Sequence, residues 1–143
     1  MRTNYFFETG GQGFELEMAD IVSLHARREW GAKAVRFGTQ YQDKFEGTDF
    51  FVLGVPIDVT LAFEKKNKTR KLGSMNLDGL TIDFGIRFGN RKANFKTPVL
   101  VIGAHTAIGI TMNNMWIALD TIKRNIHEIL NIGMDKYFLE TDA

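Results

Sequence analysis

The chain has 143 residues, a formal net charge of +1 and no cysteine. This length suits a single domain, residues 1–143. The near-neutral charge excludes a uniformly basic protein surface, so nucleic-acid binding would need local clusters of cations. The missing cysteines exclude disulfides, zinc–thiolate sites and a cysteine nucleophile.

The sequence indicates neither a histidine metal site nor a membrane segment. The three histidines (His25, His105 and His127) are far apart and form no HxxxH pair, which argues against a histidine zinc site. The first 15 residues lack an apolar signal core, and no apolar run approaches the roughly 18 residues that cross a bilayer. We therefore expect a cytoplasmic protein with no membrane partner.

The first predicted element is a helix over residues 14–30, after the glycine-rich stretch GGQG at residues 10–13. Its stripe recurs at helical spacing and comprises Phe14, Met18, Ile21, Val22 and His25. Gly31 is a suitable helix stop, and the following residues predict a strand and then a loop.

Residues 47–63, GTDFFVLGVPIDVTLAF, predict a tight hairpin. Gly54 can take the positive φ that its turn requires. On the second arm, Asp58 and Thr60 alternate with apolar residues, which indicates a strand with one buried face. The apolar set is Ile57, Val59, Leu61 and Phe63.

The rest of the chain predicts a loop over residues 64–79, an alternating strand over 80–92 and a strand buried on both faces over 98–104. A last helix is expected over residues 112–132, with Gly133 at its end. The predicted fold class is therefore α/β (mixed α+β). A central four- to five-stranded mixed sheet would be flanked by an N-terminal and a C-terminal helix.

Two aspartates could meet on the predicted hairpin. If the turn has two residues, Asp49 lies opposite Asp58 or Thr60, which would place paired side chains about 5 Å apart at Cβ. Two carboxylates this close repel unless they share a proton or a divalent cation such as Mg²⁺. Aspartates beside turns also cap backbone N–H groups, so a purely structural role stays open.

The segment over residues 10–64 resembles the PD-(D/E)XK nuclease superfamily, which has the restriction-endonuclease-like fold. Asp49 in GTDFF matches the family's first acid, and Asp58 in PIDVT matches the second. The upstream segment from GQGFELEMADIV to AKAVRF resembles the family's glutamate helix, so the resemblance implies Glu15 or Glu17 as a further carboxylate.

This resemblance implies a Mg²⁺- or Mn²⁺-dependent endonuclease, with Asp49, Asp58 and Glu15 as the metal ligands. Thr60 stands where the family has its lysine. Arg87, on the polar face of the strand over residues 80–92, is the first candidate to supply the missing positive charge, and Lys92 is the second.

Two basic clusters point to a phosphate-bearing partner. One comprises Lys65, Lys66, Lys68, Arg70 and Lys71, and the other contains Arg87, Arg91, Lys92 and Lys96. The clusters would meet if the segment between them folds back as a hairpin. An acidic protein partner, or a solvated loop that protects a sheet edge, would account for them equally well.

We therefore expect a divergent PD-(D/E)XK-like protein that binds nucleic acid, DNA rather than RNA, and hydrolyses phosphodiesters. The alternative is a catalytically inactive nuclease-fold module, such as a phage-type inhibitor or accessory protein that acts on a nucleoprotein enzyme. The apolar stripe of the last helix is expected to pack internally, although pairing with a second copy as a homodimer stays open.

Overall fold

The computed structural model describes residues 11–38, 48–60, 63, 68–77, 80–88, 98–104 and 112–141. Along the chain these residues form α2 (Gly11–Trp30), the short 3-10 helix η1 (Ala32–Ala34), β1 (Val35–Phe37), β2 (Phe50–Val52), β3 (Val55–Thr60), β4 (Thr69–Leu77), β5 (Leu80–Arg87), β6 (Val99–Ala104) and α3 (Met112–Thr141). None of the described helices is long and apolar enough to span a membrane.

The described strands form one mixed sheet in the order β1-β2-β3-β6-β5-β4. The β3–β6 pair is parallel, and the other neighbouring strands are antiparallel. This arrangement confirms the mixed α+β class with an N-terminal and a C-terminal helix, and the sheet has six strands where four or five were expected.

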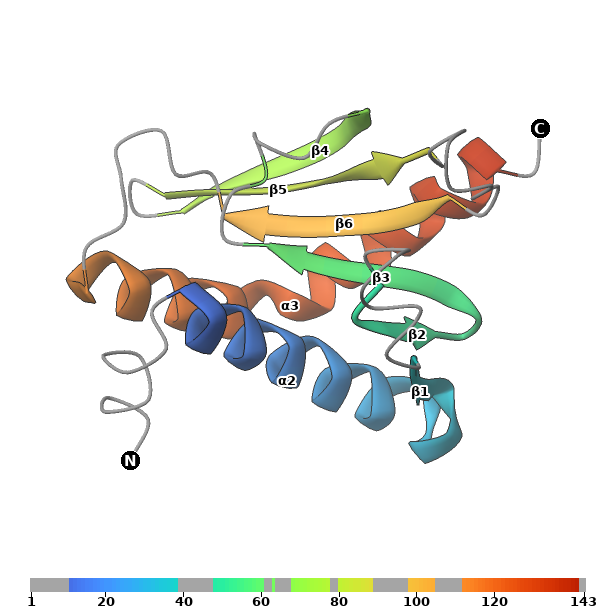
Figure 1. The fold of residues 1–143 in the computed structure, drawn as a ribbon, viewed down its shortest axis with the longest axis horizontal. Coiled ribbons are helices and arrows are strands. Elements are labelled where there is room, and N and C mark those ends of the chain that lie inside the picture. The colour runs from blue at the N-terminus through green and yellow to red at the C-terminus, as the bar shows by residue number, and fades with distance from the viewer. Residues whose placement is uncertain are drawn as a thin grey trace.

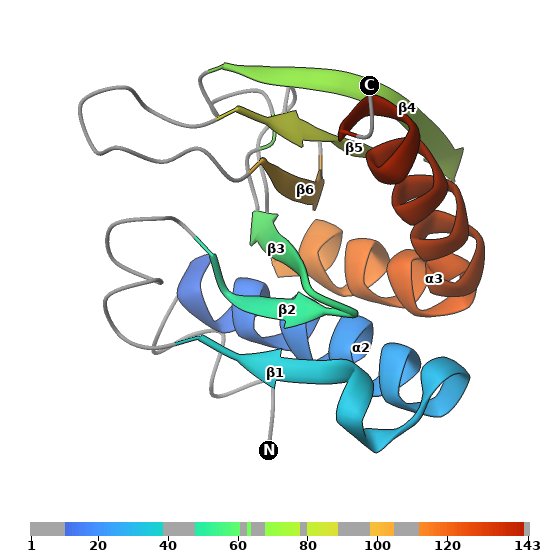
Figure 2. The same cartoon turned by 90° about the vertical axis from the view of Figure 1, so that its right-hand side faces the viewer.

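Both helices pack on one face of the sheet, as Figures 1 and 2 show. The helix α2 covers β1, β2 and β3, whereas α3 covers β4, β5 and β6. Because side chains alternate along a strand, every second residue faces this helical layer. The main core contains Ile57 and Val59 of β3 together with Met18 and Val22 of α2 and Ile122 of α3.

The helix α2 confirms the predicted N-terminal helix and begins three residues earlier, at Gly11. Its buried stripe includes Met18, Val22 and Ala26. The helix ends as expected, because Gly31 takes a φ of 100° and donates its N–H to Arg27 O at 2.9 Å. A positive φ of this size suits glycine, which lacks a Cβ.

The two strands at the centre of the sheet are buried on both faces. This confirms the prediction for β6, in which every residue is buried. It corrects the prediction for β3, where the alternation indicated one buried face but all six residues are buried. The polar residues Asp58 and Thr60 are 5% and 4% exposed, so the face of β3 opposite the helices is covered as well, with Arg87 packed against Asp58.

The prediction of a loop over residues 64–79 is wrong for Thr69–Leu77, which form β4. This strand lies at one edge of the sheet and pairs with β5 alone, so it does not need the apolar composition of an inner strand. A bulge between Lys71 and Gly73 also breaks its alternation. Sequence periodicity is therefore weak at a strand that tertiary pairing stabilises.

The helix α3 continues past Gly133 to Thr141, which corrects the predicted end of the last helix. Its apolar stripe continues through the buried residues Met134 and Tyr137. Polar contacts also hold the added turns to the sheet, since Tyr137 Oη donates to Pro98 O at 2.7 Å and Lys136 Nζ donates to Leu72 O at 2.8 Å. These contacts outweigh the weak helix propensity of one glycine.

Candidate functional site

The hairpin that carries the predicted acid pair has a two-residue turn. Leu53 and Gly54 both have positive φ, 50° and 83°, the combination found in type I′ turns. Phe50 of β2 pairs with Ile57 of β3 in this antiparallel ladder. The ladder ends at this pair, and the N–H of Asp49 also bonds to Ile57, so the prediction that Asp49 lies opposite Asp58 or Thr60 is not confirmed.

The Asp49 carboxylate extends the ladder where β2 stops. Its main-chain N–H donates to Ile57 O at 2.8 Å, and its Oδ2 accepts from the N–H of Val59 at 2.8 Å. The β2–β3 ladder begins at Phe50, so the N–H of Val59 lies beyond the reach of a β2 carbonyl. A carboxylate oxygen is a strong acceptor for such a group. Asp49 therefore stabilises the end of the β2–β3 pair.

Replacing Asp49 with alanine should lower the free energy of unfolding by about 1.5 kcal/mol, because the N–H of Val59 loses a charged acceptor. Asp49→Asn is the matched control, since its amide oxygen can still accept, and we expect a loss of less than about 0.8 kcal/mol. Urea unfolding followed by circular dichroism would measure both. Equal losses for the two variants would contradict this role for Asp49.

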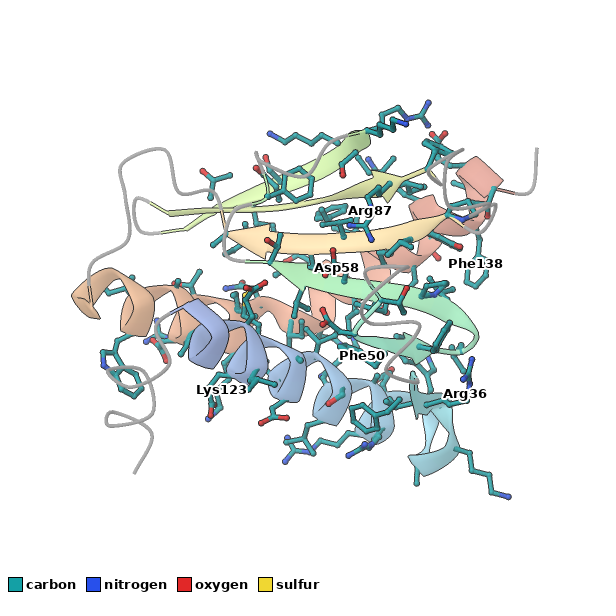
Figure 3. The ribbon with its side chains drawn as sticks, viewed as in Figure 1. Arg36, Phe50, Asp58, Arg87, Lys123 and Phe138 are labelled. Atoms are coloured by element: carbon teal, nitrogen blue, oxygen red, sulfur yellow. The ribbon has the colours of Figure 1, made fainter. Side chains whose placement is uncertain are left out.

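Asp58 forms a buried ion pair with Arg87. Arg87 Nη1 lies 2.7 Å from Asp58 Oδ2, and the two side chains are 18% and 7% exposed. Because β6 lies between β3 and β5, this contact reaches across a whole strand, and in Figure 3 the two side chains meet over β6. The guanidinium stabilises a charge that would otherwise be costly to bury.

A second carboxylate is buried on the same face of the sheet. Asp83 of β5 is 2% exposed, and its Oδ1 lies 3.3 Å from Lys71 Nζ of β4. Asp83 and Arg87 are four residues apart on β5, so they share the face opposite the helices. That face therefore carries two cation–carboxylate pairs built from three strands, with the cations more exposed than the acids.

Thr60, at the position of the family lysine, packs against a glycine. It is aligned with Gly103 of the parallel neighbour β6. A Cβ added at Gly103 would lie 2.5 Å from Thr60 Cγ2 and 2.8 Å from Thr60 O. The threonine methyl group thus fills the space that glycine leaves, and the residue holds β3 and β6 in close contact.

The glutamates expected from the resemblance lie in a different layer. Glu15 and Glu17 belong to α2, which packs against the face of β3 that carries Ile57 and Val59. The Asp58 side chain lies on the opposite face. Within the described part of the chain, Asp49, Asp58 and Glu15 do not form a group of three ligands close enough to share a metal ion.

These residues do not fit a resident Mg²⁺ ion. One oxygen of Asp49 accepts a main-chain N–H, and one oxygen of Asp58 accepts from the guanidinium of Arg87. A divalent cation beside Asp58 would also face the positive charge of Arg87. We therefore derive no hydrolytic step from this arrangement.

The predicted basic residues divide between described and undescribed parts of the chain. Lys68 immediately precedes β4, Arg70 and Lys71 lie at its start, and all three are exposed. Arg70 pairs with Glu140 near the end of α3. Other predicted contacts lie outside the described residues, namely Lys65, Lys66, Arg91 and Lys92.

The one group of three histidine or acidic side chains that converges among the described residues was not predicted. It comprises His25, Glu29 and His127, whose ligand atoms all lie within 4.8 Å of one another. Partial burial, and secondarily the neighbouring His127, lower the pKa of His25 below its ordinary value. Sequence spacing could not indicate this group, because 102 residues separate the two histidines.

No protein-family model, curated protein or solved structure matches the chain.

Proposed function

We propose that this chain is a nucleic-acid-binding protein that contacts the phosphate backbone along the edge strand β4 and does not cut it. The observation that carries the proposal is the run of exposed cations just before and at the start of β4: Lys68, Arg70 and Lys71. Cations on a sheet edge can contact successive phosphates of an extended backbone, and such contacts supply most of the sequence-independent affinity for nucleic acids.

Ion pairs support the cations without covering them. Arg70 is bound to Glu140 and Lys71 to Asp83, yet the Arg70 and Lys71 side chains stay 54% and 53% exposed. An arginine or lysine held in this way loses less side-chain entropy when it binds a phosphate. The β4–β5 register also places Thr69 opposite Arg87, so one residue of the second basic cluster lies beside the first cluster.

The state of the acid pair favours binding without cleavage. Asp49 and Asp58 each use a carboxylate oxygen in a contact that stabilises the sheet. In this proposal the chain keeps a PD-(D/E)XK-like arrangement of acids as a structural feature. Duplex DNA is the first ligand to test, with single-stranded DNA and RNA as comparisons.

The test is fluorescence anisotropy of labelled 20-base-pair DNA with the double variant Lys68→Gln/Arg70→Gln. Lys71 is left in place because it pairs with the buried Asp83. We expect the wild type to bind with Kd of about 1–100 μM near physiological salt. The variant should bind at least about tenfold more weakly, with the slope of log K against log salt smaller by about 1.5 because two phosphate contacts are lost.

The matched control is Arg28→Gln/Lys123→Gln, which removes the same charge from exposed positions on α2 and α3. We expect this variant to retain wild-type affinity within about twofold, because its cations lie away from β4. If DNA affinity fell equally in both variants, the loss would follow from net charge alone, which would contradict a binding surface at β4.

Incubation of the same complexes with Mg²⁺ or Mn²⁺ tests the second half of the proposal. We expect labelled DNA to be bound and to stay intact. Cleavage that disappears in Asp58→Asn would overturn the proposal and favour the nuclease. Absence of binding to all three nucleic acids would instead favour the inhibitor or accessory protein with a nucleoprotein partner.

A further inference from the structure

The two helices of the helical layer carry a pair of facing histidines. His25 of α2 and His127 of α3 approach with Nε2 and Nδ1 3.0 Å apart, and their rings are nearly perpendicular at 75°. Glu29 follows His25 by one helical turn, and its Oε2 lies 3.8 Å from His127 Nδ1. Three ligand atoms of three side chains thus converge on one point between the helices.

We propose that His25, Glu29 and His127 bind a divalent transition-metal ion of the Zn²⁺ class and that this ion links α2 to α3. Zinc binds imidazole nitrogen and carboxylate oxygen at about 2.0–2.2 Å, so two ligand atoms of a tetrahedral site lie about 3.4 Å apart. The contacts of 3.0 Å and 3.8 Å lie on either side of that separation. Small side-chain rotations would therefore complete the site.

Asn131 supports the orientation of His127 that this site requires. Its side-chain Nδ2 lies 3.0 Å from His127 Nε2, the ring nitrogen that does not face His25, and a half-turn of the amide would place Oδ1 there instead. Metal-bound histidines usually donate their other N–H to a nearby acceptor, which fixes the ring. The Asn131 amide supplies such an acceptor when its oxygen is turned to Nε2. His127 Nδ1 is then the nitrogen presented to the metal.

The ligand types select the class of ion. Two imidazoles and one carboxylate suit Zn²⁺, Co²⁺, Ni²⁺ or Cu²⁺, whereas Mg²⁺ prefers oxygen ligands alone. The side chains of His127 and Glu29 are 55% and 42% exposed, so an ion can enter from solvent and water can complete its coordination. The site lies in the helical layer, on the other side of the sheet from the Asp58–Arg87 pair.

Calorimetric titration of Zn²⁺ into chelator-treated protein without a polyhistidine tag tests the proposal. We expect one Zn²⁺ ion per chain with Kd below about 10 μM, and at least about tenfold weaker binding in His25→Ala and in His127→Ala. Glu29→Gln should weaken binding less than either histidine variant. Glu128→Gln is the matched control, because it removes an acid next to His127 that is not part of the group.

Two results would overturn the proposal. One is absence of stoichiometric binding to the wild type, which would leave the histidines as an ordinary hydrogen-bonded surface pair. The other is unchanged affinity in both histidine variants, which would place the ion elsewhere. Because DNA binding is expected to stay intact in His25→Ala, failure of this site is distinguishable from failure of the β4 surface.

Thermal unfolding with saturating Zn²⁺ gives an independent readout. An ion that binds only the folded chain stabilises it, so the wild-type midpoint should rise by at least about 3 °C. The midpoints of His25→Ala and His127→Ala should not rise, although these exposed or half-exposed positions should still allow folding. An equal rise in the wild type and in both variants would contradict a metal bridge between α2 and α3.

Discussion

Replacing Arg87 with alanine is expected to lower the free energy of unfolding by about 3–5 kcal/mol, because the variant leaves the Asp58 carboxylate without its cation. Asp58 is 5% exposed on an inner strand, so its carboxylate has little contact with water. Breaking one partner of a buried pair costs more than the net contribution of the pair, since the remaining charge stays desolvated. Urea unfolding monitored by circular dichroism and tryptophan fluorescence would measure the loss.

Two further variants separate charge from geometry at this pair. Arg87→Lys keeps the charge but loses the planar guanidinium, and we expect an intermediate loss. The double variant Asp58→Leu/Arg87→Met should recover most of the stability lost in Arg87→Ala, because apolar residues of similar size often replace a buried pair at little cost. A loss below about 1 kcal/mol in Arg87→Ala would contradict the buried pair.

Replacing Phe84 with alanine should cost about 3–5 kcal/mol, the range found when a large aromatic ring is removed from a packed core. Phe84 is 2% exposed and faces the helical layer from the centre of β5. Its ring lies over Gly73 of β4, where an added Cβ would be 2.6 Å from Phe84 Cζ, and it also approaches Gly133 of α3. The cavity left by alanine would lie between β4, β5 and α3.

Phe84→Leu should cost less, about 1.5 kcal/mol, because leucine fills part of that space. Phe138→Ala is the surface control, since Phe138 is 42% exposed, and we expect a loss of less than about 1 kcal/mol. Chemical unfolding measures all three variants. Similar losses for Phe84→Ala and Phe138→Ala would contradict the central position of Phe84 in the core.

Elements with a strong local period could be predicted from the sequence. In β5 the apolar residues Ile82, Phe84 and Ile86 alternate with Asp83, Gly85 and Arg87, and the three apolar residues are buried in the core. The stripe Leu119, Ile122, Ile126 and Ile129 of α3 is likewise buried. Burial against one neighbouring layer imposes these periods, so they are visible in one segment at a time.

Elements that depend on distant partners could not be predicted in the same way. The edge strand β4 is polar and bulged, and its pairing with β5 is what makes it a strand. The end of α3 continues beyond Gly133 because Tyr137 and Lys136 bond to Pro98 and Leu72. The helix or strand propensity of a segment does not depend on such distant contacts and therefore cannot predict them.

The sequence alone indicated the mixed α+β class and the tight turn of the hairpin, and its lack of cysteine excludes thiol chemistry. Only the tertiary structure decided what Asp49 and Asp58 contact, since Arg87 reaches Asp58 from 29 residues away and across β6. The fold also brings His25 and His127 together. Their wide separation in the sequence had argued against a histidine metal site, because spacing along the chain was the only information used. A helix or strand period can be recognised within one segment, whereas the partners of a buried charge or of a histidine lie on distant segments that only the fold brings together.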